Sequence, residues 1–145
     1  MTTAVSDATS PKLWDQQIMS EQKPRILIVE DDAATAHAYR TSLERAGFQV
    51  HVAADGQAGL EFIQGTAPDG VLLDLMMPKL NGIQFLKSIR ACHHLARIPI
   101  MVYTNAFIPN FVDEARAAGA TEVFSKSKLT PQSLIVAFSA SIPPG

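Results

Sequence analysis

The chain has 145 residues, 47% of them apolar and 18% charged, values typical of a single soluble globular domain with a buried core. Its formal net charge is −2 and it contains no basic block, which argues against direct binding of nucleic acid through the phosphate backbone. No apolar run approaches the roughly 18 residues of a membrane span, no secretory signal pattern begins the chain, and Cys92 has no disulfide partner, so we expect a cytoplasmic protein without membrane contact.

The composition divides the chain into three predicted parts. Residues 1–24 are rich in Ser, Thr, Asp and Gln and predict a flexible N-terminal extension, 25–142 predict a folded domain, and 143–145 a short tail. Within the extension, four apolar residues lie at helical spacing: Leu13, Trp14, Ile18 and Met19. They leave two interpretations open, a loosely docked tail or an arm that binds a partner or packs in a dimer.

Strand and helix patterns alternate from residue 25 onward. Five short apolar runs have the character of buried strands: 26–29, 48–53, 71–74, 98–103 and 121–125. Five stretches with helical spacing or helix-capping residues follow them: 32–46, 56 or 57–64, 82–91, 110–118 and 130–141. Because parallel strands joined by helices form right-handed crossovers, this alternation predicts an α/β fold with a doubly wound parallel sheet.

Carboxylates close two of the predicted strands. Glu30 and Asp31 follow the first strand, and Asp74 ends the third. If these strands are neighbours, their acids meet at the edge where open α/β sheets bind ligands. Clustered carboxylates repel one another, so the arrangement favours a site for a cation such as Mg²⁺, beside which a carboxylate is a competent nucleophile toward phosphorus. Asp32 is interpreted as a helix N-cap only.

Two other strand ends carry groups suited to phosphoryl oxygens. Thr104 follows the fourth strand with a hydroxyl, and Lys126 follows the fifth with an ammonium group. Taken singly, Thr104 could be a turn residue, Lys126 a surface lysine, and the acids ordinary helix caps. Their joint occurrence at matching strand ends favours a functional site.

Together these segments resemble the receiver domain of bacterial response regulators, the CheY-like family. The resemblance covers about residues 24–142. It is carried by the segments 26–32, 74–78, 99–104 and 118–120, with Asn81-Gly82 and Lys126. It implies a five-stranded sheet of order 2-1-3-4-5 in a flavodoxin-like three-layer sandwich.

The resemblance also implies roles for individual residues. Asp74 corresponds to the phosphoacceptor, Thr104 to the switch hydroxyl, and Lys126 to the lysine of the family's active site. The implied Mg²⁺ ligands are Asp31, Asp74, the backbone carbonyl of Met76 and, through water, Glu30.

The expected function is that of a single-domain response regulator in a two-component phosphorelay. A histidine kinase or phosphotransfer protein donates the phosphoryl group, and a downstream protein binds the changed face of the fourth helix, fifth strand and fifth helix. The chain would catalyse its own phosphorylation and dephosphorylation only, so we do not expect a turnover enzyme. The last helix has five successive apolar residues, 134–138, which cannot all face inward and make a homodimer a further candidate.

Three positions depart from the family pattern: Asn105, Val123 and Ser127. Ser127 replaces the usual proline, and we expect it to loosen the loop that aims Lys126. Val123 stands where an aromatic switch residue is common, and Phe124 should point to the opposite face of its strand. Asn105 is larger than the usual residue and would crowd the phosphoryl group, whereas Ala106 and Met76 offer nothing to orient an attacking water.

Two other functions remain open from the sequence. The departures at Val123 and Ser127 favour a receiver-like interaction module that works without phosphorylation, while the complete acidic site disfavours it. A Mg²⁺-dependent phosphatase or phosphotransferase on a similar sheet is the other. Such enzymes commonly carry a second acid two residues after the nucleophile, where this chain has Met76.

Overall fold

The computed structural model describes residues 23–77, 80–105 and 109–143, and these form a five-stranded parallel sheet of order β2-β1-β3-β4-β5. The strands are β1 (Arg25–Val29), β2 (Gln49–Ala53), β3 (Gly70–Asp74), β4 (Ile100–Thr104) and β5 (Glu122–Ser125). The helices are α3 (Ala33–Arg45), α4 (Gly56–Gly65), α5 (Gly82–Ala91), α6 (Pro109–Ala117) and α7 (Pro131–Ser141), with a short 3-10 helix, η1 (His93–Leu95). The predicted fold class and strand order are confirmed. Nearly all of the predicted extension, and Ala106, lie outside the described residues.

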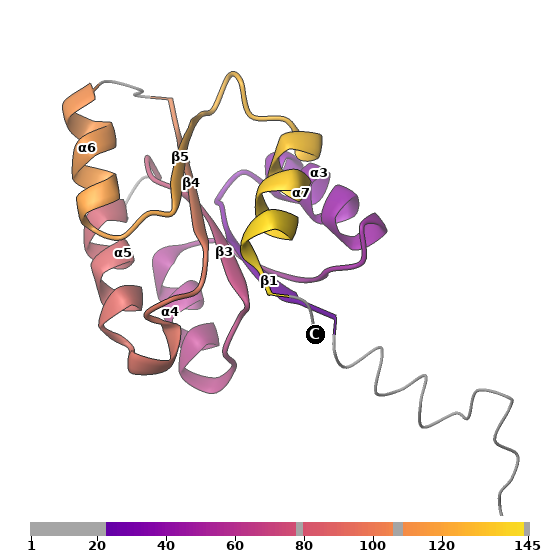
Figure 1. Cartoon of the computed structure of the whole chain (residues 1–145), viewed down its shortest axis with the longest axis horizontal. Helices are drawn as coiled ribbons and strands as arrows, with labels where there is room; N and C mark the ends of the chain where they lie inside the picture. Colours follow the sequence, from indigo (N-terminus) through magenta and orange to yellow (C-terminus); the bar gives the residue numbers. More distant parts are fainter. Residues whose placement is uncertain (1–22, 78–79, 106–108, 144–145) are drawn as a thin grey trace, which may run out of the picture.

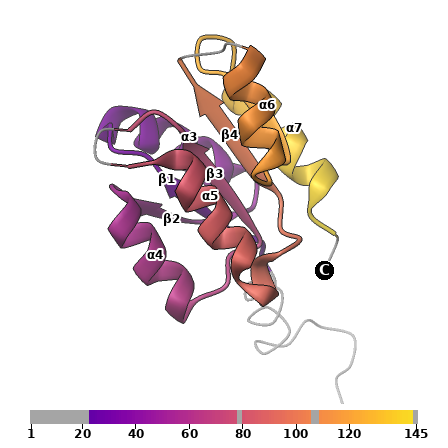
Figure 2. The same ribbon diagram turned by 90° about the vertical axis from the view of Figure 1, so that its left-hand side faces the viewer.

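The helices cover the sheet on both sides and make three layers (Figures 1 and 2). Helices α3 and α7 pack on one side, called here the α3/α7 face, and helices α4, α5 and α6 pack on the other, called the α4/α5/α6 face. All residues of β3 and β4 are buried, which explains why these strands are continuous apolar runs rather than alternating ones. No helix within the described ranges is both long and apolar enough to cross a bilayer.

Local signals set most element ends close to the predicted positions. The Asp32 side chain caps α3 by accepting from Thr35 N, and Gly47 follows that helix at φ +102, a conformation that favours glycine. Helix α7 begins with a capping box between Thr130 and Ser133. The fourth strand begins at Ile100 and not at residue 98, because Pro99 has no N–H to donate to the ladder.

Candidate functional site

The acidic residues gather where β1 and β3 end. The two strands are hydrogen-bonded neighbours, with Val29 opposite Leu73, so Glu30 and Asp31 emerge beside Asp74. One carboxylate oxygen from each of the three acids lies within 4.8 Å of the others. The expectation that the tips of the first and third strands lie side by side is confirmed.

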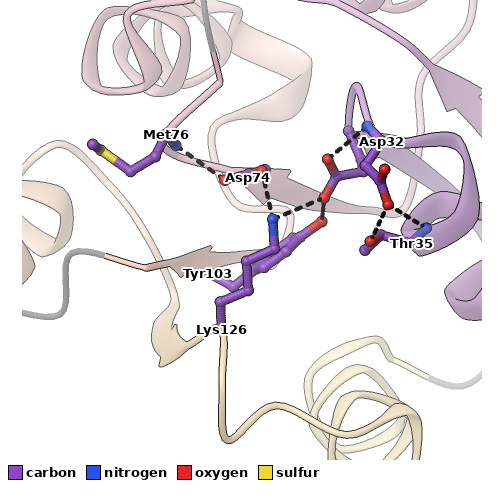
Figure 3. Close-up of polar contacts among 7 residues, drawn as sticks. Asp32, Thr35, Asp74, Met76, Tyr103 and Lys126 are labelled. Atoms are coloured by element: carbon purple, nitrogen blue, oxygen red, sulfur yellow. Dashed lines mark hydrogen bonds and ion pairs between the residues drawn. The ribbon is translucent and has the colours of Figure 1, made fainter.

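Asp74 is fixed by donors on both of its oxygens (Figure 3). It is 3% exposed, its Oδ1 accepts from the backbone N of Met76 at 3.0 Å, and its Oδ2 accepts from Lys126 Nζ at 3.2 Å. The loop after Asp74 is anchored because Leu75 and Met77 are buried in the α4/α5/α6 face, while Met76 between them is 51% exposed. A buried carboxylate with a fixed orientation therefore stands at the end of β3.

Glu30 is the most deeply buried acid of the cluster, at 1% exposure. Its Oε2 accepts from the backbone N of Asp32 at 2.9 Å, and its Oε1 accepts from the hydroxyl of Tyr103. Burial raises the pKa of Glu30, although the Tyr103 and Asp32 donors oppose that shift. Asp31, by contrast, is exposed and faces solvent at the mouth of the cluster.

Lys126 supplies the positive charge of the site. Its Nζ pairs with Asp74 at 3.2 Å and lies 3.7 Å from Oε1 of Glu30. Burial lowers the pKa of Lys126, but the charges of Asp74 and Glu30 outweigh burial, so the pKa is raised and the ammonium stays charged at neutral pH. The backbone N of Lys126 donates to the Thr104 carbonyl at 2.9 Å, which ties the end of β5 to the end of β4.

Thr104 lies at the neighbouring strand end, fully buried, and is paired in register with Ser125 of β5. Since Asp74 is paired with Tyr103 across β3 and β4, Thr104 continues one residue beyond the Asp74 position on the adjacent strand. The described structure thus brings the predicted acids and Lys126 into direct proximity, with Thr104 on the next strand.

Tyr103 is the site residue that the sequence reasoning missed. Its hydroxyl donates to Glu30, and Lys126 Nζ lies 5.4 Å from the centre of its ring. The signal was a tyrosine within an otherwise apolar buried strand, because a buried tyrosine hydroxyl usually requires a hydrogen-bond partner. Burial, followed by the bond to Glu30, raises the pKa of Tyr103, so its hydroxyl is a donor at physiological pH.

The departures from the family pattern take definite positions. Val123 is buried in the α4/α5/α6 face, while Phe124 packs against the opposite core, which confirms that the two side chains point to opposite faces. Ser127 lies within hydrogen-bond distance of Ser125, with 3.0 Å between their hydroxyl oxygens. Asn105 is exposed beside Thr104. The predicted loosening at Ser127 and crowding at Asn105 stay predictions.

The donor set fits a hard divalent cation. Three carboxylates face one ammonium group, so the cluster carries excess negative charge, and the side-chain atoms that it offers as metal ligands are all carboxylate oxygens. Mg²⁺ prefers one or two carboxylates with the rest of its shell filled by water and substrate oxygen, which the exposed Asp31 and the buried Asp74 can provide. The arrangement can therefore hold Mg²⁺ next to a fixed carboxylate nucleophile.

Comparison with known proteins agrees with this geometry. The chain is similar in structure to the chemotaxis protein CheY4 of Vibrio cholerae, with a TM-score of 0.77 and 28% identity over 83% of this chain and 99% of that one. A response regulator of Burkholderia multivorans is 34% identical, with a TM-score of 0.69 over 85% of this chain and 98% of its own.

Curated relatives match a shorter region. The response regulator MprA of Mycolicibacterium vanbaalenii is 40% identical over 80 residues, which are 55% of this chain and 34% of the relative. The DNA-binding dual master transcriptional regulator RpaA of Synechocystis is 38% identical over 81 residues, 56% of this chain and 34% of the relative. The matches thus span about a third of these relatives. The family model of the response regulator receiver domain matches residues 26–138, and the chain belongs to that family.

Proposed function

We propose that this chain accepts a phosphoryl group on Asp74 from a phosphohistidine of a histidine kinase or phosphotransfer protein, in a Mg²⁺-dependent reaction. One observation carries the proposal: the buried Asp74 carboxylate lies within 4.8 Å of Glu30 and Asp31 and forms an ion pair with Lys126. A nucleophile, a set of metal ligands and a fixed cation thus share one strand edge.

The chain's own residues have separate tasks in this proposal. Asp31 and Asp74, the backbone carbonyl of Met76 and, through water, Glu30 would hold Mg²⁺. When bound, Mg²⁺ would neutralise charge between the carboxylates and the incoming phosphoryl oxygens. Lys126, already 3.2 Å from Asp74, would neutralise charge on a second phosphoryl oxygen.

In the transfer, one Asp74 oxygen forms a bond to phosphorus while the bond from phosphorus to the donor's histidine nitrogen breaks, and that nitrogen keeps the electron pair. The acyl phosphate adds charge and acceptor oxygens at the end of β3. The Thr104 hydroxyl would donate to one of these oxygens and move the β4 end. The chain performs this self-phosphorylation and, in a separate step, the attack of water on the acyl phosphate, which releases inorganic phosphate and regenerates the Asp74 carboxylate, without turnover of a separate substrate.

The output proposed for this change is a protein contact on α6, β5 and α7. The proposal follows from membership of the receiver family, and Val136 on α7, 58% exposed, is one apolar side chain that a downstream protein or a second copy of the chain could contact there. The relative RpaA is described as DNA-binding, but this chain spans about a third of that protein, and its own net charge is −2. We propose a cytoplasmic signalling role for the receiver domain, residues 25–142, in which this domain makes no direct contact with nucleic acid.

A phosphorylation-independent interaction module is the second candidate. The observation favouring it is Val123, an aliphatic residue packed in the α4/α5/α6 face where many receivers have an aromatic switch residue. In that case the acidic cluster would be structural, and the same α6, β5 and α7 surface would bind its partner constitutively.

Incubation with acetyl phosphate and MgCl₂ tests the proposal. We expect an acid-stable, base-labile phosphoryl adduct by mass spectrometry, absent without Mg²⁺ and absent from Asp74→Asn. Asp32→Asn is the matched control, because asparagine also caps helices and the adduct should persist. A folded protein that forms no adduct with either acetyl phosphate or a cognate kinase would favour the second candidate.

A further inference from the structure

Tyr103 connects the core of the protein to the acidic site. Its hydroxyl donates to Oε1 of Glu30, and the Nζ of Lys126 lies 5.4 Å from its ring centre and 3.7 Å from the same Oε1. Figure 3 shows Tyr103 and Lys126 side by side, with the Lys126 ammonium beside Asp74. One side chain therefore contacts both an acid and the cation of the site.

The position of the Tyr103 hydroxyl is fixed by its surroundings. Tyr103 is fully buried on the inner strand β4, paired in register with Asp74 of β3 on one side and Phe124 of β5 on the other. On the α3/α7 face, its ring forms a T-shaped pair with the ring of Tyr39, at a centroid distance of 5.8 Å and an interplanar angle of 62°. Because the backbone and ring are both constrained, the hydroxyl presents a donor at one place.

That donor completes the set of bonds that orients Glu30. The Asp32 backbone N holds Oε2, and Tyr103 holds Oε1, so the two donors together define how the carboxylate plane is turned. Glu30 is 1% exposed and thus has little solvent to replace a missing donor. Without the Tyr103 hydroxyl, Oε1 would keep only its 3.7 Å contact with Lys126 Nζ, and the Asp32 backbone N would be the one remaining hydrogen-bond donor that orients the carboxylate in the described chain.

We propose that Tyr103 is a positioning residue, whose hydroxyl holds the Glu30 carboxylate in the orientation that supports Mg²⁺ binding at the Asp31–Asp74 site. The inference rests on the Mg²⁺ site of the proposed function. It differs from an ordinary structural hydrogen bond in a measurable way: a purely structural bond would affect folding but leave the Mg²⁺ affinity of the folded protein unchanged.

The test is a titration of the full chain with MgCl₂ and no other ligand. Changes in the amide chemical shifts, measured by NMR, report Mg²⁺ binding. Tyr103→Phe keeps the ring under Lys126 and removes only the hydroxyl. We expect it to weaken Mg²⁺ binding about tenfold, the lower end of the effect usual for partners that orient metal ligands. Tyr39→Phe is the matched control, since it removes a neighbouring buried hydroxyl that does not bond to Glu30 within the described chain, and its Mg²⁺ affinity should equal that of the unaltered protein.

A second measurement separates action through Glu30 from action by another route. In a Glu30→Gln background, Tyr103→Phe should cause no further loss of Mg²⁺ affinity, because its target is already altered. An equal additional loss there would overturn the inference, as would unchanged or tighter Mg²⁺ binding in Tyr103→Phe alone. If the unaltered protein binds no Mg²⁺, the proposed function fails and this inference fails with it. If the unaltered protein and Tyr103→Phe bind Mg²⁺ with the same affinity, only this inference is overturned.

Discussion

The two faces of the sheet are built from different side chains and reach the site in different ways. On the α4/α5/α6 face, the fully buried core is almost entirely aliphatic, with Phe85 the one aromatic residue among its described buried members. The α3/α7 face holds four buried aromatic residues: Tyr39, Phe48, Tyr103 and Phe138. The first face anchors the Asp74 loop by burying Leu75 and Met77, whereas the second reaches Glu30 through a hydrogen bond from Tyr103.

This difference indicates how a change at the acidic site can reach each face of the sheet. On the α4/α5/α6 face, aliphatic packing of Leu75 and Met77 restrains the acceptor loop, and Val123 leaves that face without an aromatic side chain on β5. The α3/α7 face reaches the site through a side-chain hydrogen bond, because Tyr103 donates to Glu30 and packs against the ring of Tyr39 on α3. The acceptor is thus held from one side and its neighbouring acid from the other.

The largest expected effect on stability comes from removing a buried aromatic side chain from the α3/α7 face. Phe138 is fully buried and lies 6.3 Å from Phe48 between ring centres, so Phe138→Ala should lower the free energy of unfolding by about 3–5 kcal/mol. Val136→Ala, two residues earlier on α7 and 58% exposed, should change it by less than about 0.5 kcal/mol. Urea unfolding measures both, and similar losses in the two variants would contradict the described packing of α7.

Two glycines test how tightly each face is packed, because on each face a phenylalanine ring lies close to a glycine. A Cβ at Gly70 would lie 2.8 Å from Phe138, and a Cβ at Gly59 would lie 3.0 Å from Phe85. Gly70→Ala should destabilise the protein by about 1–3 kcal/mol through overpacking. Gly59 lies within α4, where alanine gains about 1 kcal/mol of helix propensity over glycine. This gain should offset the cost of the close contact with Phe85, so Gly59→Ala should leave the free energy of unfolding nearly unchanged.

Thermal or urea unfolding of the two glycine variants measures this difference directly. A stable Gly70→Ala protein would mean that the Phe138 ring can move aside, and the α3/α7 face would then be less tightly packed than its buried aromatic residues indicate. A strongly destabilised Gly59→Ala would show instead that Phe85 is the more rigid ring.

The smallest effect is a pH dependence where the α3/α7 face meets the site. Burial raises the pKa of Glu30 above its ordinary value of 4.5. Ionisation of Glu30 therefore destabilises the metal-free folded state progressively as the pH rises above 4.5. Glu30→Gln removes this penalty, and its stability relative to the unaltered protein in EDTA should therefore increase between about pH 4 and pH 7. The exposed Glu114→Gln is the control. A relative stability that falls with pH would mean that the Tyr103 and Asp32 donors outweigh burial.

The topology could be predicted because its physical signals are local and repeated. Continuous apolar runs such as Ile26–Val29 occur in strands covered on both sides, and helical stretches between them require parallel crossovers. Once β1 and β3 are neighbours, the acids that follow them must share an edge, so the clustering of Asp31 and Asp74 follows from the order of strands.

The link between Tyr103 and Glu30 could not be predicted in the same way. A continuous apolar run lacks alternation, so the sequence does not show which face Tyr103 points to. The two residues are separated by 73 positions, and their contact depends on the register of β4 against β3 and of β3 against β1. The burial of Glu30 could not be predicted either, because charged residues are mostly exposed.

The central claim is that the ends of β1 and β3 share one divalent ion beside Asp74. Anomalous diffraction from crystals grown with MnCl₂ tests it most directly, because Mn²⁺ also prefers oxygen ligands and can be located by its own scattering. The account predicts one strong anomalous peak at coordination distance from carboxylate oxygens of Asp31 and Asp74. A fully loaded crystal with Mn²⁺ bound only elsewhere on the protein would contradict it.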